Sequence, residues 1–366
     1  MSDIKYMNLA IELAKNGIGY VNPNPLVGSV IVKDGFVIGE GYHERYGELH
    51  AERNALKSCI ISPNGATIYV TLEPCCHHGK TPPCTEAIIE SGISRVVIGC
   101  LDPNPIMSGK SVELLRKHNI EVEVGILEDD CKSLIKVFSK FITTKKPYVM
   151  MKYAMTMDGK IATYTNKSKW ISSEASRLNV QKTRHEYSAI MVGVNTIIYD
   201  NPLLTCRLEN GKNPIRIICD TNLRTPLDSN IITTSNTIKT IIATSSNDEA
   251  KKAFYRKKGC VIITINKKDN YIDLQELIRI LGDMNIDSIL LEGGSTLNYS
   301  ALNSQIVDRV QAYISPKIFG GTGKSPVSGL GVDLPSNAFL LTNSTLTKFE
   351  NDYLIESDVI YPCSQE

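Results

Sequence analysis

The sequence predicts an α/β protein built from two domains, and three observations lead to this prediction. The chain has 366 residues, and one domain usually holds about 100–200 residues. Strand-like and helix-like segments alternate along almost the whole chain, which is typical of sheets covered by helices. A polar segment that ends in proline, residues 143–147, separates two such series. We therefore expect one domain at 1–145 and another at 146–366.

The elements of the first domain follow from hydrophobic periodicity and turn chemistry. The first 17 residues form an amphipathic helical pattern without the basic-then-apolar layout of a signal peptide. Residues 27–33 and 36–42 predict a hairpin, because Asp34-Gly35 between them is a favoured two-residue turn. The same criteria predict helices at 50–59, 85–91, 111–117 and 128–142, and strands at 66–72, 95–99 and 121–125.

The second domain opens with an apolar run that predicts a strand at 147–155. Further short apolar runs, typical of buried strands, lie at 189–193, 214–219, 240–244, 260–265 and 288–291. Helical patterns lie at 174–186, 248–257 and 273–281. From about residue 307 onward the sequence predicts strands and turns.

The composition disfavours several classes of protein. A dedicated nucleic-acid binder needs a basic excess, whereas 40 Lys and Arg here face 39 Asp and Glu. No window approaches 18 uninterrupted apolar residues, so we expect no membrane-spanning helix. Without a signal peptide, the ten cysteines indicate a cytoplasmic protein with reduced thiols or metal ligands rather than disulfides.

Three residues of the first domain have the composition of a catalytic zinc site. His50 begins a predicted helix, Cys75 follows a predicted strand, and Cys84 stands where another helix begins. One imidazole and two thiolates suit Zn²⁺ and leave a fourth tetrahedral position for water. Glu52 follows His50 by two residues and can carry a proton beside that water without being a ligand. The alternative is a closed structural site, whose fourth ligand would be Cys76, His77 or His78.

The order His-x-Glu, then Pro-Cys and a further Cys, is similar to the signature of the zinc nucleobase deaminases. The usual spacing is Pro-Cys-x-x-Cys, but here eight residues separate Cys75 from Cys84. With Asn24-Pro25-Leu26-Val27-Gly28 and Gly41-Tyr42-His43, this longer loop resembles the deaminase half of the bifunctional riboflavin-biosynthesis RibD family.

This resemblance implies a cytidine-deaminase-like α/β/α sandwich that deaminates 2,5-diamino-6-ribosylamino-4(3H)-pyrimidinone 5′-phosphate. Zinc lowers the pKa of its bound water from 15.7 to about 7 and so provides hydroxide. By the resemblance, His50, Cys75 and Cys84 bind Zn²⁺, and Glu52 is the proton donor and acceptor. The positions that match substrate contacts are Asn24, His43, His77 and Lys80. Lys80 also suits a phosphate ester chemically, the alternative being a solvated loop lysine. The alternative for Asn24 is a turn residue before Pro25.

The second domain contains no G-x-G-x-x-G motif, so the sequence does not indicate a Rossmann dinucleotide site. Instead, the predicted strand 288–291 runs into Glu292-Gly293-Gly294-Ser295-Thr296. A buried strand, two glycines and a hydroxyl residue that opens a helix direct backbone N–H groups toward an anion. The alternative is an ordinary strand-to-helix turn with Ser295 as its N-cap.

Three other segments are similar to the reductase half of the same family: residues 155–162, Trp170-Ile171-Ser172 and residues 193–205. The resemblance implies a dihydrofolate-reductase-like α/β domain that uses NADPH to reduce the ribosyl side chain of 5-amino-6-(5-phosphoribosylamino)uracil to the ribityl form. Implied NADP contacts are Ala154, Trp170, Thr196, Asp200, Gly294, Ser295 and Thr296. Implied substrate contacts are Lys152, Ser168, Arg184, Leu204, Arg207 and Glu292. Which group donates a proton to the sugar stays open among Lys152, Asp200 and Glu292.

Alternatives to several of these assignments remain. Arg184 and Arg207 suit phosphate binding but are also compatible with surface ion pairs, and Trp170 is compatible with a core or lid position. The whole chain is also compatible with a cytidine or tRNA-adenosine deaminase fused to an unrelated module, or with an inactive zinc scaffold. The charge of +1 and the single Trp disfavour the former, and the intact His-x-Glu disfavours the latter. The family resemblance implies a homo-oligomer, either a dimer or a tetramer.

Overall fold

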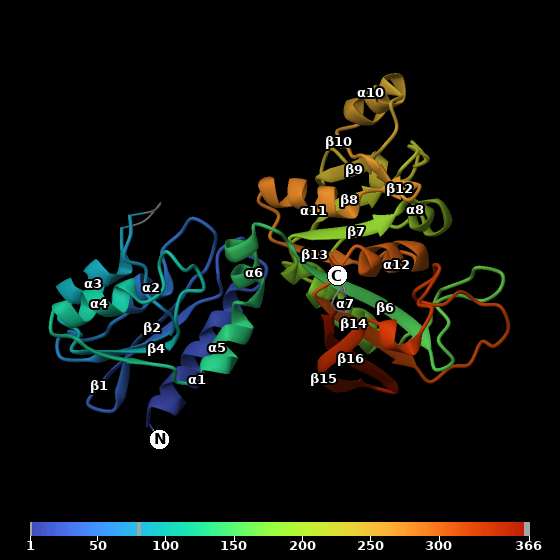
Figure 1. Ribbon diagram of the computed structural model, residues 1–366. Coiled ribbons are helices and arrows are strands. Elements are labelled where there is room, and N and C mark those ends of the chain that lie inside the picture. Colours follow the sequence, from blue (N-terminus) through green and yellow to red (C-terminus); the bar gives the residue numbers. More distant parts are fainter. Residues whose placement is uncertain (1, 79–81, 362–366) are drawn as a thin grey trace. The chain divides into compact units, whose positions relative to one another are not determined.

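The computed structural model describes residues 2–78 and 82–361. The chain divides into two compact units, Met1–Lys145 and Lys146–Glu366. Each unit has its own sheet, covered by helices, and its own hydrophobic core (Figure 1). The α/β class predicted from the sequence is therefore confirmed for both.

The first unit contains a five-stranded sheet in the order β2-β1-β3-β4-β5. Its strands are β1 (Gly28–Lys33), β2 (Phe36–Tyr42), β3 (Thr67–Leu72), β4 (Arg95–Cys100) and β5 (Glu121–Val124). β1 runs antiparallel to β2 and β3, whereas β3, β4 and β5 are parallel to one another. The predicted hairpin is confirmed, and its turn residues Asp34 and Gly35 have φ of 51° and 78°, as the favoured two-residue turn requires.

Helices cover both faces of this sheet and form the predicted three-layer sandwich (Figure 1). On one face lie α1 (Ser2–Ala14), which leads into the 3-10 turn Lys15–Gly17, and α5 (Glu128–Leu134). On the other lie α2 (Ala51–Lys57), α3 (Cys84–Glu90) and α4 (Lys110–Lys117). The single helix predicted at 128–142 is wrong, because α5 and α6 (Lys136–Thr144) are separate. The chain leaves helical geometry at Ile135, a buried core residue, where packing overrides local propensity.

The second unit contains a nine-stranded sheet in the order β10-β9-β8-β7-β13-β6-β14-β16-β15. Its strands are β6 (Tyr148–Thr156), β7 (Ala189–Gly193), β8 (Ile215–Cys219), β9 (Thr240–Thr244), β10 (Val261–Thr264), β13 (Ser288–Leu291), β14 (Arg309–Ser315), β15 (Leu340–Phe349) and β16 (Asp352–Ile360). All strands from β10 to β14 in this order are parallel, and β16 and β15 add an antiparallel edge. A separate small hairpin, β11 (Lys267–Lys268) with β12 (Tyr271–Ile272), was not predicted.

Alternate residues of this sheet face two different cores. On β7, Met191 packs in the core that includes α11 (Leu274–Asp283) and α12 (Ser295–Asn303), whereas Ile190 faces the opposite core. That opposite side is covered by α8 (Val194–Asp200), α9 (Asn230–Thr233) and α10 (Glu249–Lys257). On the same side, Val180 of α7 (Glu174–Glu186) packs against Tyr313 of β14. The sequence prediction lacks α8 and α9, which have seven and four residues.

The helices give no sign of a membrane span. Within residues 2–78 and 82–361, none is both long and apolar enough to cross a bilayer.

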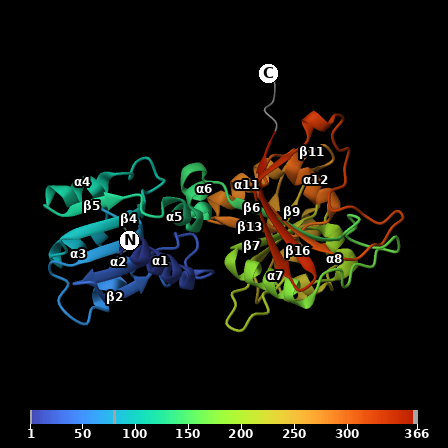
Figure 2. The same cartoon turned by 90° about the horizontal axis from the view of Figure 1, so that it is seen from below.

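The carboxyl ends of the parallel strands meet at one edge of the sheet, where open α/β sheets bind ligands. In Figure 2, which shows the chain from below, β7, β13 and β6 lie side by side in this unit. β6, β7, β8 and β13 end at Thr156, Gly193, Cys219 and Leu291. The residues that follow them in sequence line a common pocket.

Candidate active sites

A cluster of potential metal ligands lies between α2, β3 and α3 in the first unit. His50 is the N-cap of α2, Cys75 follows β3, and Cys84 is the first residue of α3. Nδ1 of His50 lies 3.5 Å from Sγ of Cys75 and 3.4 Å from Sγ of Cys84. Zn–N and Zn–S bonds at tetrahedral angles separate nitrogen and sulfur by about 3.6 Å. The three residues therefore fit Zn²⁺.

Two glycines on β2 allow α2 to lie directly on the sheet. A Cβ on Gly41 would lie 2.3 Å from the backbone nitrogen of Ala55, and one on Gly39 would lie 2.5 Å from the carbonyl oxygen of the same residue. This close packing places His50 and the first turn of α2 against the cysteines. Glu52, in that turn, is only 3% exposed.

The two cysteines shift each other's pKa in opposite directions, and Glu52 lies beside them. The pKa of Cys75 falls to about 4, chiefly because the Cys84 thiol donates a hydrogen bond to it, and the pKa of Cys84 rises for the same reason. The backbone N–H of Cys84 also donates to Sγ of Cys75 at 3.3 Å. Burial, aided by the charge of Cys75, raises the pKa of Glu52 to about 7. Its carboxyl group can therefore take up and release a proton near neutral pH.

Asn24 and His43 form a hydrogen-bonded pair next to the ligand cluster. Nδ2 of Asn24 lies 3.0 Å from Nε2 of His43, and Nδ1 of His43 lies 3.0 Å from the carbonyl oxygen of Leu49. The His43 and His50 rings meet edge to face at 5.5 Å. Burial lowers the pKa of His43 and keeps its ring neutral. The backbone N–H of Asn24 also donates to Val21, so Asn24 serves the turn as well as the pair.

The loop between Cys75 and Cys84 contains the other predicted contacts of this site. His77 is exposed, and Lys80 lies outside the described residues. His78 pairs with Glu86 at 3.3 Å and is not a member of the ligand cluster. Within residues 2–78 and 82–361, the only ligand group around His50 consists of Cys75 and Cys84. The closed structural site with a fourth protein ligand is not found there.

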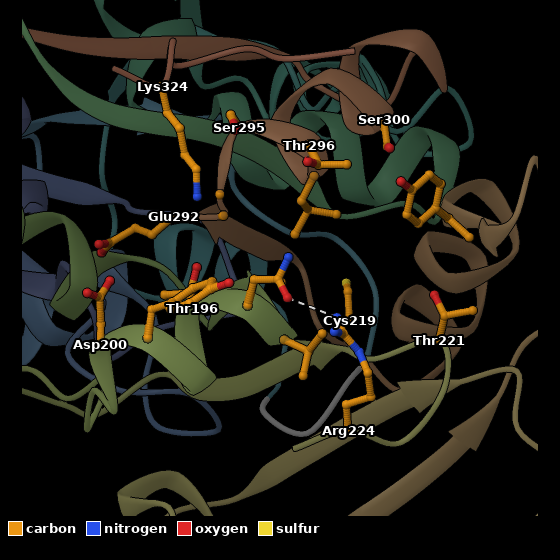
Figure 3. Close-up of a pocket in the computed structure, with 18 of the residues that line it drawn as sticks. Thr196, Asp200, Cys219, Thr221, Arg224, Glu292, Ser295, Thr296, Ser300 and Lys324 are labelled. Atoms are coloured by element: carbon orange, nitrogen blue, oxygen red, sulfur yellow. Dashed lines mark hydrogen bonds between the residues drawn. The ribbon is translucent and has the colours of Figure 1, made fainter. Parts of the chain in front are cut away.

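The pocket of the second unit has a volume of about 370 Å³ (Figure 3). It brings together the segments after β6, β7, β8 and β13. The predicted site residues in its lining are Ser168, Thr196, Asp200, Glu292, Gly294, Ser295 and Thr296. The predicted site residues outside its lining are Lys152, Ala154, Trp170, Arg184, Leu204 and Arg207.

The start of α12 is open toward this pocket. The N-cap is Gly294, not Ser295 as in the alternative reading of the sequence, and no described side chain caps the helix. Gly294 has φ of −74°, and a Cβ there would come no nearer than 3.8 Å to any side chain, the nearest atom being Oγ1 of Thr196. Neither backbone conformation nor packing requires glycine here. A ligand lying against the backbone would require glycine at this position. The site therefore fits a bound pyrophosphate.

A buried ion cluster lies at the acidic end of the pocket. Nε and Nη2 of Arg184 donate to the two carboxylate oxygens of Glu292 at 2.7 and 3.0 Å, and Nζ of Lys152 lies 3.9 Å from Glu292. Burial raises the pKa of Glu292, but the charges of Arg184 and Lys152 outweigh it and lower the pKa to about 2. Burial lowers the pKa of Lys152. Arg184 is thus in a buried ion pair, and the surface-pair alternative for it is wrong.

The other predicted residues outside the pocket lining differ in their exposure and in their contacts. Trp170 is 61% exposed and stacks on the guanidinium of Arg177 at 4.7 Å, so a core position for it is wrong. Leu204 is buried with φ of 52°. Arg207 is exposed, and its backbone N–H donates to Gln181. Ala154 packs beside Val180 and Tyr313.

Sequence reasoning missed several residues of the pocket. The missed lining residues with polar or charged side chains include Asn195, Thr221, Asn222, Arg224 and Lys324. A usable signal existed for Arg224, because the residues after a predicted parallel strand gather at the binding edge. Lys324 follows the glycine-rich turn at 320–323, and its Nζ lies 5.3 Å from the centroid of the Tyr199 ring.

Comparisons with known proteins give matches to both units. Residues 1–100 match the family "Cytidine and deoxycytidylate deaminase zinc-binding region", and residues 147–355 match "RibD C-terminal domain". The riboflavin biosynthesis protein RibD of Actinobacillus pleuropneumoniae is 51% identical over 99% of this chain and 96% of its own length. The RibD of Escherichia coli is 36% identical over 88% of this chain and 90% of its own.

Solved structures extend the likeness to the whole chain. A diaminohydroxyphosphoribosylaminopyrimidine deaminase/5-amino-6-(5-phosphoribosylamino)uracil reductase from Thermotoga maritima superposes with a TM-score of 0.85 at 40% identity, over 98% of this chain and 99% of its own. RibD of Acinetobacter baumannii superposes with a TM-score of 0.87 at 32% identity, with the same coverage. The chain therefore belongs to the RibD family, the bifunctional deaminase–reductases of riboflavin biosynthesis, which use Zn²⁺ and NADPH.

Proposed function

We propose that the unit Met1–Lys145 deaminates 2,5-diamino-6-ribosylamino-4(3H)-pyrimidinone 5′-phosphate, and that the unit Lys146–Glu366 then reduces 5-amino-6-(5-phosphoribosylamino)uracil. The observation that carries the deaminase assignment is the ligand cluster of His50, Cys75 and Cys84 with the buried Glu52 beside it. The reductase assignment rests on the pocket at the carboxyl ends of β7, β8 and β13. The substrates are those in the name of the Thermotoga maritima relative.

In the deaminase unit, His50, Cys75 and Cys84 would hold Zn²⁺, which when bound would activate a water molecule for attack on the amino-bearing ring carbon. Glu52 would accept one proton of this water and deliver it to the ring nitrogen, and would then transfer the second proton, from the added hydroxyl, to the amino group that leaves as ammonia. Burial, which raises the pKa of Glu52, favours uptake of the proton from the water. Burial of Glu52 also excludes bulk water from this exchange.

We assign recognition of the pyrimidine to the Asn24–His43 pair. The hydrogen bond between them fixes the Asn24 amide, which leaves its carbonyl oxygen and one N–H for the ring edge. His77 and Lys80 would contact the ribose phosphate. The exposed position of His77 allows that contact, and the role of Lys80 stays a prediction from the sequence.

In the reductase unit, NADPH when bound supplies the hydride. The free N–H groups at Gly294, Ser295 and Thr296 would hold its pyrophosphate, with Thr196 and Asp200 facing them across the pocket (Figure 3). We place Ala154 and Trp170 toward the nicotinamide. These positions come from the family resemblance.

We assign the reductase substrate to the region around the ion cluster of Lys152, Arg184 and Glu292. Glu292 both lines the pocket and pairs with Arg184, so it joins the cofactor side to the substrate side. Lys152, whose pKa burial lowers, is a more ready proton donor than an exposed lysine. Ser168, Leu204 and Arg207 would complete the contacts, with Arg207 suited to the phosphate.

A two-stage assay tests the function. The diaminopyrimidinone phosphate is expected to release ammonia without NADPH, and only the deaminated product is expected to consume NADPH. Ammonia release and NADPH absorbance are followed separately with the purified full-length chain. Ammonia release from cytidine or tRNA, with none from the aminopyrimidine phosphate, would contradict the deaminase assignment. NADPH consumption by the substrate before deamination would contradict the proposed order.

We further propose a homo-oligomer in the cytoplasm. The edge strand β15 exposes Leu340, Leu341 and Leu346, and a long exposed edge of this kind can pair with another chain. Multi-angle light scattering is expected to give the mass of a dimer or a tetramer, and replacing Leu346 by Lys is expected to lower it. A monomer of the unaltered chain at micromolar concentration would contradict the proposal. The nine described cysteines are free thiols, which agrees with a reducing compartment.

A further inference from the structure

One cation of the reductase pocket has no role in the function described so far. Arg224 lies in the loop after β8, at the end of the pocket opposite to Asp200 and Glu292 (Figure 3). Its Nη2 donates to Oδ1 of Asn195 at 2.9 Å. Among the residues that the structure describes, no carboxylate forms an ion pair with Arg224. The guanidinium therefore keeps donors for a bound anion.

The loop that carries Arg224 is held in place independently of any ligand. Asp220 is fully buried, and its Oδ2 accepts hydrogen bonds from the backbone N–H and the hydroxyl of Thr225 at 2.8 and 2.7 Å. The hydroxyl of Tyr255 donates to the carbonyl of Thr225 at 2.5 Å. Leu223, between these anchors, is also buried. The loop thus presents Arg224 at a fixed position on the pocket wall.

The same anchoring removes the carboxylate that an NADH site would use. In Rossmann sheets, whose ligands also bind at the carboxyl ends of the strands, an Asp or Glu after a neighbouring strand binds the ribose 2′-hydroxyl of NADH, whereas an Arg accommodates a 2′-phosphate. Asp220 follows β8 directly, but its hydrogen-bonded oxygen faces Thr225 and the side chain is inaccessible. Thr221, Asn222 and Arg224, which do line the pocket, offer hydroxyl, amide and guanidinium groups and no negative charge.

The distance along the sheet between the start of α12 and Arg224 suits the binding of one dinucleotide to both. α12 starts after β13, and Arg224 follows β8, which is the second strand from β13. Two strand spacings are about 10 Å, a separation that one adenosine spans from the pyrophosphate. A second anion at Arg224 would therefore belong to the adenosine end of the same cofactor.

We propose that Arg224, supported by Asn195 and flanked by Thr221 and Asn222, binds the 2′-phosphate of NADPH and sets the preference for NADPH over NADH. Arg224 is exposed in the absence of ligand, so its replacement does not disturb the core. This inference rests on the proposed placement of the pyrophosphate at the start of α12.

Equilibrium binding to the full-length chain tests the proposal. Titrations with NADPH and NADH are followed by nucleotide fluorescence, for the unaltered chain and for Arg224→Gln, Arg224→Lys and Arg256→Gln. Loss of a hydrogen bond to a charged group predicts that Arg224→Gln raises the Kd for NADPH by about 10- to 100-fold. The Kd for NADH should change by less than about 2-fold. Arg224→Lys should recover part of the loss. Arg256, exposed on α10, is the matched control and should change neither Kd.

Competition by 2′,5′-ADP and 5′-AMP isolates the contribution of the 2′-phosphate to binding. The unaltered chain should bind 2′,5′-ADP more tightly, and Arg224→Gln should abolish this difference. A preference for 2′,5′-ADP that survives in Arg224→Gln, or an equal loss of NADPH and NADH binding, would overturn the inference and leave the reductase assignment intact. Failure of the unaltered chain to bind either dinucleotide would overturn both.

Discussion

Replacing Glu52 by Gln is expected to lower the rate of ammonia release by about 10²- to 10⁴-fold, the range attributed to a positioned general acid–base. Gln keeps the size and the hydrogen-bonding capacity of the side chain but cannot take a proton from water or return it to the leaving group. Glu52 is not one of the three ligands, so bound zinc should stay near one ion per chain. The measurements are ammonia release and zinc content by atomic emission.

Two comparison variants make this result specific. Cys84→Ser should lose both zinc and ammonia release, because Cys84 supplies a ligand sulfur close to Nδ1 of His50. Glu90→Gln, an exposed carboxylate at the end of α3, should change neither quantity. Near-normal ammonia release by Glu52→Gln would remove Glu52 from the mechanism. Loss of zinc in the same variant would make it a structural residue.

Replacing Glu292 by Gln is expected to destabilise the reductase unit by about 3 kcal/mol, the value that corresponds to a pKa lowered from 4.5 to about 2. The variant leaves the guanidinium of Arg184 and the ammonium of Lys152 buried without their common counter-ion, which is more costly than losing an exposed pair. For a domain of this size the melting temperature should fall by roughly 6–12 °C. Reductase activity should fall with it, since Glu292 lines the pocket.

The destabilisation caused by Glu292→Gln should become smaller as the pH falls. The folded-state pKa of Glu292 is lower than the unfolded value, so its contribution to stability is complete above about pH 4.5 and is lost as the pH falls toward about 2. The stability difference between the unaltered chain and Glu292→Gln should therefore shrink over this interval in denaturant titrations. Glu209 is an exposed carboxylate of the same unit. For Glu209→Gln, the stability difference from the unaltered chain should not change over this pH range. A difference independent of pH would mean that the ion cluster is not its source.

The deaminase site was predictable because its ligands are chemically distinctive residues at short spacings. His50, Glu52 and Cys75 each lie near the end of an element that periodicity reveals, so the sequence already places them together. The burial of Glu52 was not predictable. The close approach of α2 depends on Gly39 and Gly41 of β2, and only the register of β2 against β1 brings those glycines beneath the helix.

The reductase pocket was less predictable, because its walls come from strands that are distant in sequence. Thr196 and Gly294 face each other only because β13 inserts next to β7, and no local pattern specifies that strand order. Arg184 illustrates the same limit. Its residue type suggested a phosphate ligand or a surface pair, but its bidentate partner Glu292 follows more than 100 residues later.

The strand order of the second unit also has a consequence for its biosynthesis. β6 opens the unit, yet both of its neighbours, β13 and β14, lie near the other end of the unit's sequence. During translation the apolar edges of β6 stay unpaired until that late part of the chain has left the ribosome, and such non-local pairing is slow. The first unit is complete by Lys145. We therefore expect the nascent chain to acquire its zinc site before a dinucleotide pocket exists.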